Sequence, residues 1–143
     1  MFVKQISVFL ENTKGGLARL TRLIGERGID LIALSIADTE QFGILRCIVS
    51  DTERCAAQLR EAGYTARITD VLAASVPDEP GGLYKVLDLL QEADVSVEYL
   101  YSFMRGAGGR ALIILRVNDN ARAVSALRAG NVELLDCDMV RAL

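Results

Sequence analysis

The stretch ENTKGGLARL, residues 11–20, raises the question that decides the fold, because two glycines stand where an apolar helical pattern begins. The stretch PDEPGGLYKV, residues 77–86, has the same form: acidic and polar residues, Gly-Gly, leucine and then helical periodicity. A helix N-terminus leaves four backbone N–H groups unpaired and carries partial positive charge, and glycine there lets a ligand approach closely. One such turn is ordinary, whereas two in matching contexts predict a duplicated unit.

The duplication extends over nearly the whole chain. A shift of 66 residues places Gly15 on Gly81 and aligns the apolar positions of the helices that follow. After a gap of two residues, CIVSD (47–51) matches LRVND (115–119). A period this long, with two copies, predicts a duplicated small domain and not a solenoid.

Each copy has a pattern typical of the order β-α-β-β-α-β. Alternating apolar residues predict strands, and apolar residues three and four apart predict helices. Asp51 or Thr52 can cap a helix that Gly63 ends, and Gly28 can end the first helix. The predicted elements of the first copy are strand 4–11, helix 15–28, strands 29–38 and 42–50 around a turn at 39–41, helix 51–63 and strand 64–69. Those of the second copy are strand 70–76, helix 81–94, strands 95–103 and 110–117, helix 119–130 and strand 132–140.

The order of elements predicts an α+β fold of two domains, residues 1–69 and 70–143. Two β-α-β units give an antiparallel four-stranded sheet with both helices on one face, which is the ferredoxin-like arrangement. The junction near 69–71 has no Pro-, Gly- or Ser-rich linker, so we expect the copies to be rigidly joined.

Composition narrows the class of function. The chain has 143 residues, 51% of them hydrophobic, and a net charge of -3 with both signs interleaved. An acidic chain without a basic stripe argues against nucleic acid as a partner. No apolar run reaches the roughly 18 residues of a membrane span, and the N-terminus lacks the pattern of a signal peptide. We therefore expect a cytoplasmic protein with no membrane partner.

The residues that most often carry catalysis or bind metal are scarce. The chain has no histidine, the commonest general base and metal ligand, so we expect neither a metal nor a cofactor. Cys47, Cys55 and Cys137 are odd in number and widely spaced, which predicts small core residues and neither a disulfide framework nor a zinc site. Asp136 and Asp138 are predicted to lie on the outward face of an edge strand.

The two Gly-Gly stretches, with the segments that follow them, closely resemble the ACT domain, a small βαββαβ regulatory module of amino-acid biosynthetic enzymes. The matching segments are ENTKGGLARLTRLIGERGIDLIALSI (11–36) and PDEPGGLYKVLDLLQEADVSVEYLY (77–101). The resemblance covers essentially the whole chain as two tandem ACT domains. It implies that the two ferredoxin-like βαββαβ domains lie side by side, as one continuous eight-stranded antiparallel sheet with four helices on one face.

The resemblance also implies where a ligand binds: between domains, at the first strand-to-helix loop of one and the start of the second strand of its neighbour. In the first copy these positions are Glu11, Asn12, Thr13, Lys14, Gly15, Gly16, Leu17, Asp30, Leu31 and Ile32. In the second copy they are Val76, Pro77, Asp78, Glu79, Gly81, Gly82, Leu83 and Ser96. Many ACT domains carry Asn or His at these contacts, so the acidic residues here predict that the two sites differ.

The ligand that the resemblance implies is a free amino acid. Backbone N–H groups at 15–17 can hold its carboxylate, and Asp30 or Asn12 can accept from its ammonium group. The protein is then not an enzyme but an allosteric regulatory subunit, a homodimer that senses an amino acid and acts in trans. Its partner would be an enzyme of amino-acid or acyl-CoA metabolism.

Two alternatives use other features of the chain. A small isomerase or hydrolase of the same fold would need Asp30, Glu98 or a tyrosine as general base. A protein-interaction module would need no ligand. The glycine-rich stretch 102–112, with Arg105 and Arg110, lacks the ending of a P-loop and predicts a hairpin. The alternating aromatic residues of 99–103 lack the basic neighbours of an RNA-binding platform and predict burial.

Overall fold

The computed structural model describes residues 2–38, 41–103 and 108–143. Its elements are β1 (Val3–Glu11), α1 (Gly16–Glu26), β2 (Leu31–Asp38), β3 (Phe42–Val49), α2 (Thr52–Glu61), β4 (Thr65–Pro77), α3 (Gly82–Glu92), β5 (Val97–Ser102), β6 (Arg110–Val117), α4 (Asn120–Ala129), β7 (Glu133–Leu135) and α5 (Cys137–Arg141). The strands form a seven-stranded sheet in the order β2-β3-β1-β4-β6-β5, with β7 paired to β4. The pairings β1–β3, β2–β3, β4–β6, β4–β7 and β5–β6 are all antiparallel.

The element bounds repeat with the predicted shifts. Helix α3 begins and ends 66 residues after α1, while β6 and α4 begin and end 68 residues after β3 and α2. The α+β class and the duplication are therefore confirmed.

The predicted count of eight strands and four helices is wrong. The two strands expected at 64–69 and 70–76 are one 13-residue strand, β4, so the chain ends the first copy and begins the second without a turn. The sequence from Thr65 to Pro77 contains no glycine, and its only proline is the last residue, so nothing in it interrupts an extended backbone. The domain boundary that the sequence predicts between residues 69 and 70 lies inside this strand.

The last predicted strand also ends early. Residues 132–140 contain only the three-residue strand β7, and the fifth helix, α5, follows it. The Asp136 carboxylate accepts a hydrogen bond from the Met139 backbone N–H at 2.9 Å and caps this helix. Asp138 lies in its first turn, 3.8 Å from the Arg141 guanidinium. The prediction that both aspartates face outward from an edge strand is therefore wrong, because helix capping competes with extension here.

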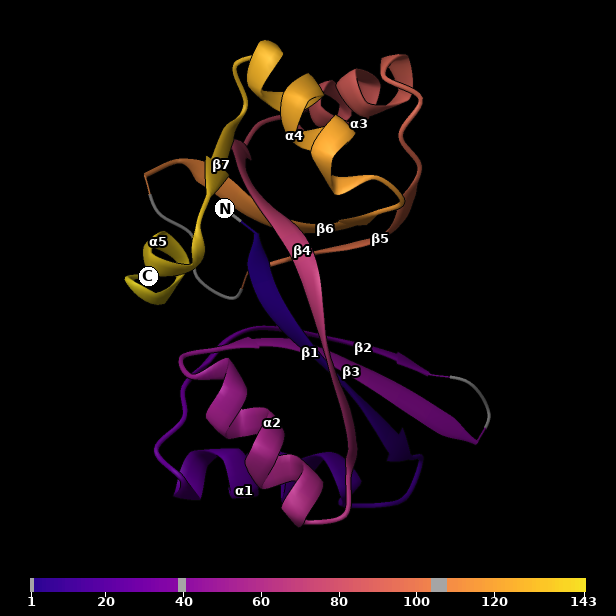
Figure 1. The fold of residues 1–143 in the computed structure, drawn as a ribbon, viewed down its shortest axis with the longest axis vertical. Coiled ribbons are helices and arrows are strands. Elements are labelled where there is room, and N and C mark those ends of the chain that lie inside the picture. Colours follow the sequence, from indigo (N-terminus) through magenta and orange to yellow (C-terminus); the bar gives the residue numbers. More distant parts are fainter. Residues whose placement is uncertain (1, 39–40, 104–107) are drawn as a thin grey trace. The chain divides into compact units, whose positions relative to one another are not determined.

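Two compact units make up the chain, and the N-terminal unit comprises Lys4–Thr69. Its helices α1 and α2 lie on the same face of β1 and β3 (Figure 1). The core between them contains Ile6, Val8, Leu10, Leu20, Ile24, Leu45, Cys47, Cys55 and Leu59. Alternate residues of β1 thus point into the core, as a period of two requires.

The C-terminal unit comprises Met1–Val3 and Asp70–Leu143. Helices α3 and α4 contact each other and lie on the same face of β5 and β6 (Figure 1). Its core contains Leu72, Ala74, Val76, Val86, Leu90, Ile113, Leu115, Val117, Val124 and Leu127. Each unit therefore has an apolar core of its own.

All four repeated helices end in the same way. At the end of α1, the Gly28 N–H donates to the Gly25 carbonyl and the Ile29 N–H to the Ile24 carbonyl, at 3.0 and 3.2 Å. This is a Schellman motif, whose turning residue adopts a left-handed conformation. The turning residues are Gly28, Gly63, Asp94 and Asn131, with φ of 69°, 90°, 56° and 60°. The predicted glycine stops are confirmed, and two non-glycine residues fill the same place in the second copy.

The cysteines agree only in part with their prediction. Cys47 and Cys55 are buried in the N-terminal core. Cys137 is half-buried at the start of α5, and its thiol donates to the Phe2 carbonyl at 3.1 Å, so its assignment to the core is wrong. Burial raises the pKa of the Cys47 thiol to about 12, and the neighbouring Cys55 adds to the rise.

Other predictions concern the loops and the aromatic strand. Tyr101 and Phe103 are buried, and Tyr99 is half-buried. Arg105, in the glycine-rich hairpin, and most of the turn expected at 39–41 lie outside the described residues. Within the described residues, no helix is long and apolar enough to cross a membrane.

Candidate functional site

Both Gly-Gly turns have the same backbone geometry. Gly15 and Gly81 adopt left-handed φ angles of 79° and 84° immediately before α1 and α3. Only glycine occupies this region without strain. Gly16 and Gly82 are the first helical residues, and a Cβ atom on Gly82 would overlap the Pro77 carbonyl oxygen. Both turns thus depend on their first glycine for its φ, and the second turn also depends on Gly82 for space.

The helices that follow these turns lack the caps that the other helices have. Helices α2, α4 and α5 have the N-cap residues Asp51, Asp119 and Asp136, whose carboxylates accept hydrogen bonds from backbone N–H groups. In contrast, α1 and α3 have no side-chain cap and no acidic residue in the first turn. A helix N-terminus favours negative charge, so these two ends are electrostatically incomplete.

The backbone N–H groups at the start of α1 remain available. Gly16 N–H donates to the Thr13 carbonyl at 3.1 Å, and Arg19 N–H donates to the Gly15 carbonyl at 3.0 Å. Among the residues that the structure describes, the N–H groups of Leu17 and Ala18 have no acceptor. The Arg19 side chain folds back over the turn, with its Nη2 atom 3.4 Å from the Thr13 hydroxyl. A cation and free N–H groups therefore lie together where an anion would bind.

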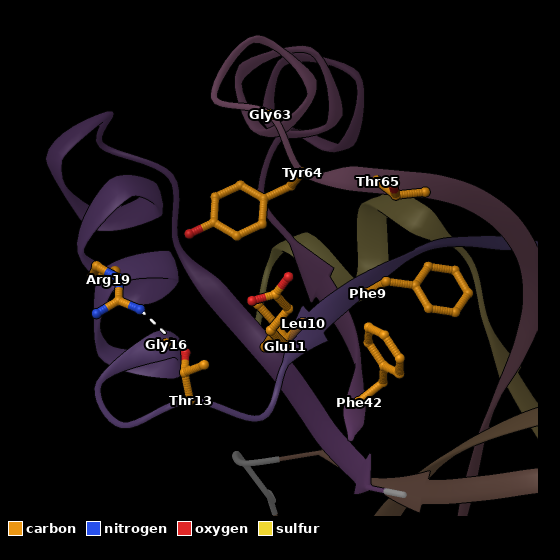
Figure 2. Close-up of a pocket in the computed structure, with 10 residues that line it drawn as sticks. All are labelled: Phe9, Leu10, Glu11, Thr13, Gly16, Arg19, Phe42, Gly63, Tyr64 and Thr65. Carbon is orange, nitrogen blue, oxygen red and sulfur yellow. Dashed lines mark hydrogen bonds between the residues drawn. The ribbon is translucent and has the colours of Figure 1, made fainter. Parts of the chain in front are cut away.

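A pocket of about 360 Å³ adjoins this turn in the N-terminal unit. The end of β1, the start of α1, the first residue of β3 and the loop after α2 enclose it (Figure 2). Its lining residues are Phe9, Leu10, Glu11, Thr13, Gly16, Arg19, Phe42, Gly63, Tyr64 and Thr65.

The pocket combines opposite charges with aromatic surface. The Glu11 carboxylate and the Arg19 guanidinium both line it, and neither forms an ion pair with any described residue. Figure 2 shows the Tyr64 ring beside them, whereas the Phe9 and Phe42 rings lie together on the other side of β1. Phe9 and Phe42 are 43% and 51% exposed, so a ligand or partner could cover them. Such a pocket can hold a zwitterion that carries an apolar group.

A second pocket, of about 230 Å³, occupies the equivalent place in the C-terminal unit. Its lining residues are Ser75, Val76, Pro77, Gly82, Lys85, Val86, Leu89, Arg110, Gly130, Asn131 and Val132. The 66-residue shift places Glu11 on Pro77 and Arg19 on Lys85, and the 68-residue shift places Phe42 on Arg110. The pockets are therefore duplicated in place but not in chemistry.

The predicted loop residues lie at these two turns. Glu11, Thr13 and Gly16 line the first pocket, while Asn12, Lys14, Gly15 and Leu17 belong to the same turn without lining it. Val76, Pro77 and Gly82 line the second pocket, while Asp78, Glu79, Gly81 and Leu83 belong to its turn.

The predicted second-strand residues lie elsewhere in each unit. Asp30 precedes β2, which begins at Leu31 and Ile32, after the opposite end of α1. The Asp30 N–H donates to the Ser50 hydroxyl at 3.0 Å, and the equivalent Ser96 N–H donates to the Asn118 side-chain oxygen at 2.9 Å. The predicted ligand contact uses these residues from a neighbouring domain. Their position within their own unit does not test that contact, which stays a prediction.

Several pocket residues were missed by the sequence-based prediction. Arg19 lies one turn after Gly16, and its side chain reaches back over the Gly-Gly turn. Tyr64 directly follows Gly63, and a Schellman stop brings the next residue back against its helix. Phe42 is the first residue of β3 and pairs with Glu11. The Gly63 stop could have revealed Tyr64, whereas the position of Phe42 depends on strand pairing.

The sequence profile of the ACT domain pair matches residues 1–139. This chain belongs to the ACT domain pair family. The family resemblance of the two Gly-Gly stretches is therefore confirmed. No curated protein matches the chain in sequence.

Solved structures share this fold. Protein BT0572 from Bacteroides thetaiotaomicron is 36% identical, with a TM-score of 0.93 over 100% of this chain and 98% of that one. The regulatory subunit of aspartate kinase from Thermus thermophilus is 16% identical, with a TM-score of 0.66 over 89% and 91% of the two chains. The corresponding subunit from Thermus flavus is 16% identical, with a TM-score of 0.65 over 90% of each chain. At this level of sequence identity, the similarity to these two subunits is a similarity of fold alone.

Among the general-base candidates of the enzyme alternative, Tyr64 lines the N-terminal pocket. Glu98 forms an ion pair with Arg116 at 3.4 Å, and neither Glu98 nor Asp30 lines either of the two pockets. Within the described ranges, no group of three or more His, Cys, Asp or Glu residues could hold a metal ion.

Proposed function

We propose that this ACT domain pair is a regulatory protein that binds a free amino acid and acts on a partner enzyme in trans. The observation that carries the proposal is the contrast in helix capping. Helices α1 and α3 begin at Gly-Gly turns without a cap, whereas α2, α4 and α5 each have an aspartate. A ligand carboxylate would supply the missing negative charge.

The N-terminal pocket suits a zwitterion. In the pocket, the Arg19 guanidinium would hold the α-carboxylate, and the Glu11 carboxylate would accept from the α-ammonium group. The free N–H groups of Leu17 and Ala18, on the adjoining turn, would add to the binding of the α-carboxylate. Charge-assisted hydrogen bonds contribute about 1.5–3 kcal/mol each. Tyr64 would contact the ligand side chain, which favours an amino acid with an apolar or aromatic group.

The proposal includes a second copy of the chain. A homodimer would bring the second-strand residues Asp30, Leu31 and Ile32 of one copy to the Gly-Gly turn of another, as the family resemblance implies. Ser96 would have the same role for the second turn. The exposed Phe9 and Phe42 offer apolar surface for such an association.

Ligand binding would control the partner enzyme through thermodynamic linkage between binding and domain arrangement. A ligand that binds one arrangement of domains more tightly than another shifts the population toward it. The fold is shared with regulatory subunits of aspartate kinase, which supports an enzyme of amino-acid metabolism as partner; an enzyme of acyl-CoA metabolism is the other candidate.

A thermal-shift screen against the twenty amino acids tests the proposal. A ligand at 100 times its Kd adds about 2.7 kcal/mol to the free energy of unfolding. We expect one amino acid, or a few related ones, to raise Tm, and Glu11→Gln and Arg19→Gln to remove the rise.

The matched control is Arg22→Gln, on the same helix. Arg22 is exposed and forms an ion pair with Glu26 at 2.7 Å, outside the pocket. This variant should keep the ligand-induced rise in Tm. If no amino acid raises Tm at millimolar concentration, or if Arg22→Gln removes the rise as fully as Arg19→Gln does, amino-acid binding at this pocket is wrong.

A further inference from the structure

The pocket of the C-terminal unit differs in charge from its duplicate. The N-terminal pocket has one carboxylate, Glu11, and one cation, Arg19. In the C-terminal pocket Pro77 replaces the carboxylate, Lys85 keeps the first cation, and Arg110 adds a second. No acidic residue is among the described residues that line it, and Asp78 and Glu79 of the adjoining loop are outside the lining. The duplication thus produced one pocket of balanced charge and one with two cations.

Arg110 is held in a fixed position at this pocket. Its Nε atom donates to the Ser75 hydroxyl at 2.6 Å, and its Nη2 atom donates to the Ser75 carbonyl at 2.8 Å. Ser75 is only 4% exposed, so this anchor is part of the sheet. The Nη1 atom has no acceptor among the residues that the structure describes. A guanidinium already fixed by two bonds loses little entropy when it binds an anion.

The remaining wall is mostly apolar, with Ser75 and Asn131 as its polar side chains, and the space is small. The apolar lining residues are Val76, Pro77, Val86, Leu89 and Val132. The volume of about 230 Å³ lies below the roughly 300–1,000 Å³ of pockets for drug-sized ligands. The lining therefore matches a small ligand with an anionic head and a short hydrocarbon body.

We propose that this pocket binds a small aliphatic carboxylate that carries no ammonium group. The carboxylate would bind between Lys85 and the unused Nη1 of Arg110, and the hydrocarbon chain would contact Val86 and Leu89. The ammonium group of an amino acid would meet two cations and no carboxylate, so the pocket rejects zwitterions by like-charge repulsion. This inference does not rest on amino-acid binding in the N-terminal unit.

The test compares two ligands with the same carbon skeleton, 4-methylpentanoate and leucine, by NMR titration of the full-length protein. We expect 4-methylpentanoate to shift the amide resonances of Val76, Lys85 and Val132, and leucine to leave these three unchanged. Lys85→Met should lower the affinity for 4-methylpentanoate at least about tenfold, because it removes a charge-assisted hydrogen bond. Lys85→Arg, which keeps the charge, should restore most of the affinity.

Matched controls separate the site from its duplicate and from simple ion binding. Arg19→Met, the equivalent change in the N-terminal unit, should leave carboxylate binding intact. Inorganic phosphate should bind more weakly than 4-methylpentanoate, because it has no group for the apolar wall. The proposal is overturned if leucine shifts the three resonances as strongly, if Lys85→Met has no effect, if phosphate competes equally, or if no shift occurs at millimolar carboxylate.

Discussion

Alanine substitution at the second glycine of each turn should have unequal effects in the two copies. A Cβ atom on Gly82 would overlap the Pro77 carbonyl oxygen, which is backbone and cannot rotate away. On Gly16 the same atom would lie 3.3 Å from the Thr13 hydroxyl oxygen and 3.4 Å from the Glu11 carbonyl oxygen. The first contact requires the backbone to move, whereas the second is only tight.

The expected magnitudes follow from these contacts. Overpacking costs about 1–3 kcal/mol, and replacement of a helical glycine by alanine gains about 0.5–1 kcal/mol. Gly82→Ala should therefore lower the free energy of unfolding by about 1–2 kcal/mol, and Gly16→Ala should be close to neutral. For a chain of 143 residues, about 3–4 °C of Tm corresponds to each kcal/mol. Gly82→Ala should then lower Tm by roughly 3–8 °C.

Urea unfolding measures the difference. The chain has four tyrosines and no tryptophan, so circular dichroism and tyrosine fluorescence serve as the two probes. Coincident transitions would justify a two-state comparison of the variants. Equal destabilisation by both substitutions, or a Gly82→Ala variant as stable as the wild type, would refute the argument that the Pro77 carbonyl excludes a side chain.

Further predictions concern helix ends and thiols. Asp94 and Asn131 are strained by their φ angles of 56° and 60°, so Asp94→Gly and Asn131→Gly should each stabilise the protein by up to about 1 kcal/mol. A urea midpoint at or below that of the wild type would contradict this. Asp51→Ala removes the cap of α2 and should cost about 1 kcal/mol, measured in the same way. Burial raises the pKa of the Cys47 thiol from 9.0 to about 12. Burial also raises the pKa of the Cys55 thiol to about 11, and the negative charge of Asp51 makes a smaller contribution to this rise. Above pH 9 the unfolded chain therefore releases thiol protons that the folded chain keeps, so stability is full below pH 9 and falls as pH rises toward 11–12. The free energy of unfolding should fall by about 1.4 kcal/mol per thiol between pH 8 and pH 10, because the loss begins near pH 9. The double variant Cys47→Ala/Cys55→Ala should show a smaller loss, measured by unfolding in urea at the two pH values.

The sequence by itself determined the repeat, the four repeated helices and the family. Helical periodicity after Gly16 and Gly82, and the stops at Gly28 and Gly63, are local signals that backbone geometry enforces within a few residues. Because both copies carry the Gly-Gly turn and the helical and strand patterns in the same order, the order of elements and the ACT resemblance followed without any tertiary contact.

Only the tertiary structure decided the continuity of β4 and the contents of the two pockets. Two adjacent strands and one long strand have the same alternating pattern. The structure has a single strand over 65–77, of which residues 72–77 pair with β6. Phe42 reaches the first pocket through its register with Glu11, and Arg110 reaches the second through its bonds to Ser75. Strand pairing joins residues far apart in the chain, so the chemistry of each pocket was not visible in the local sequence.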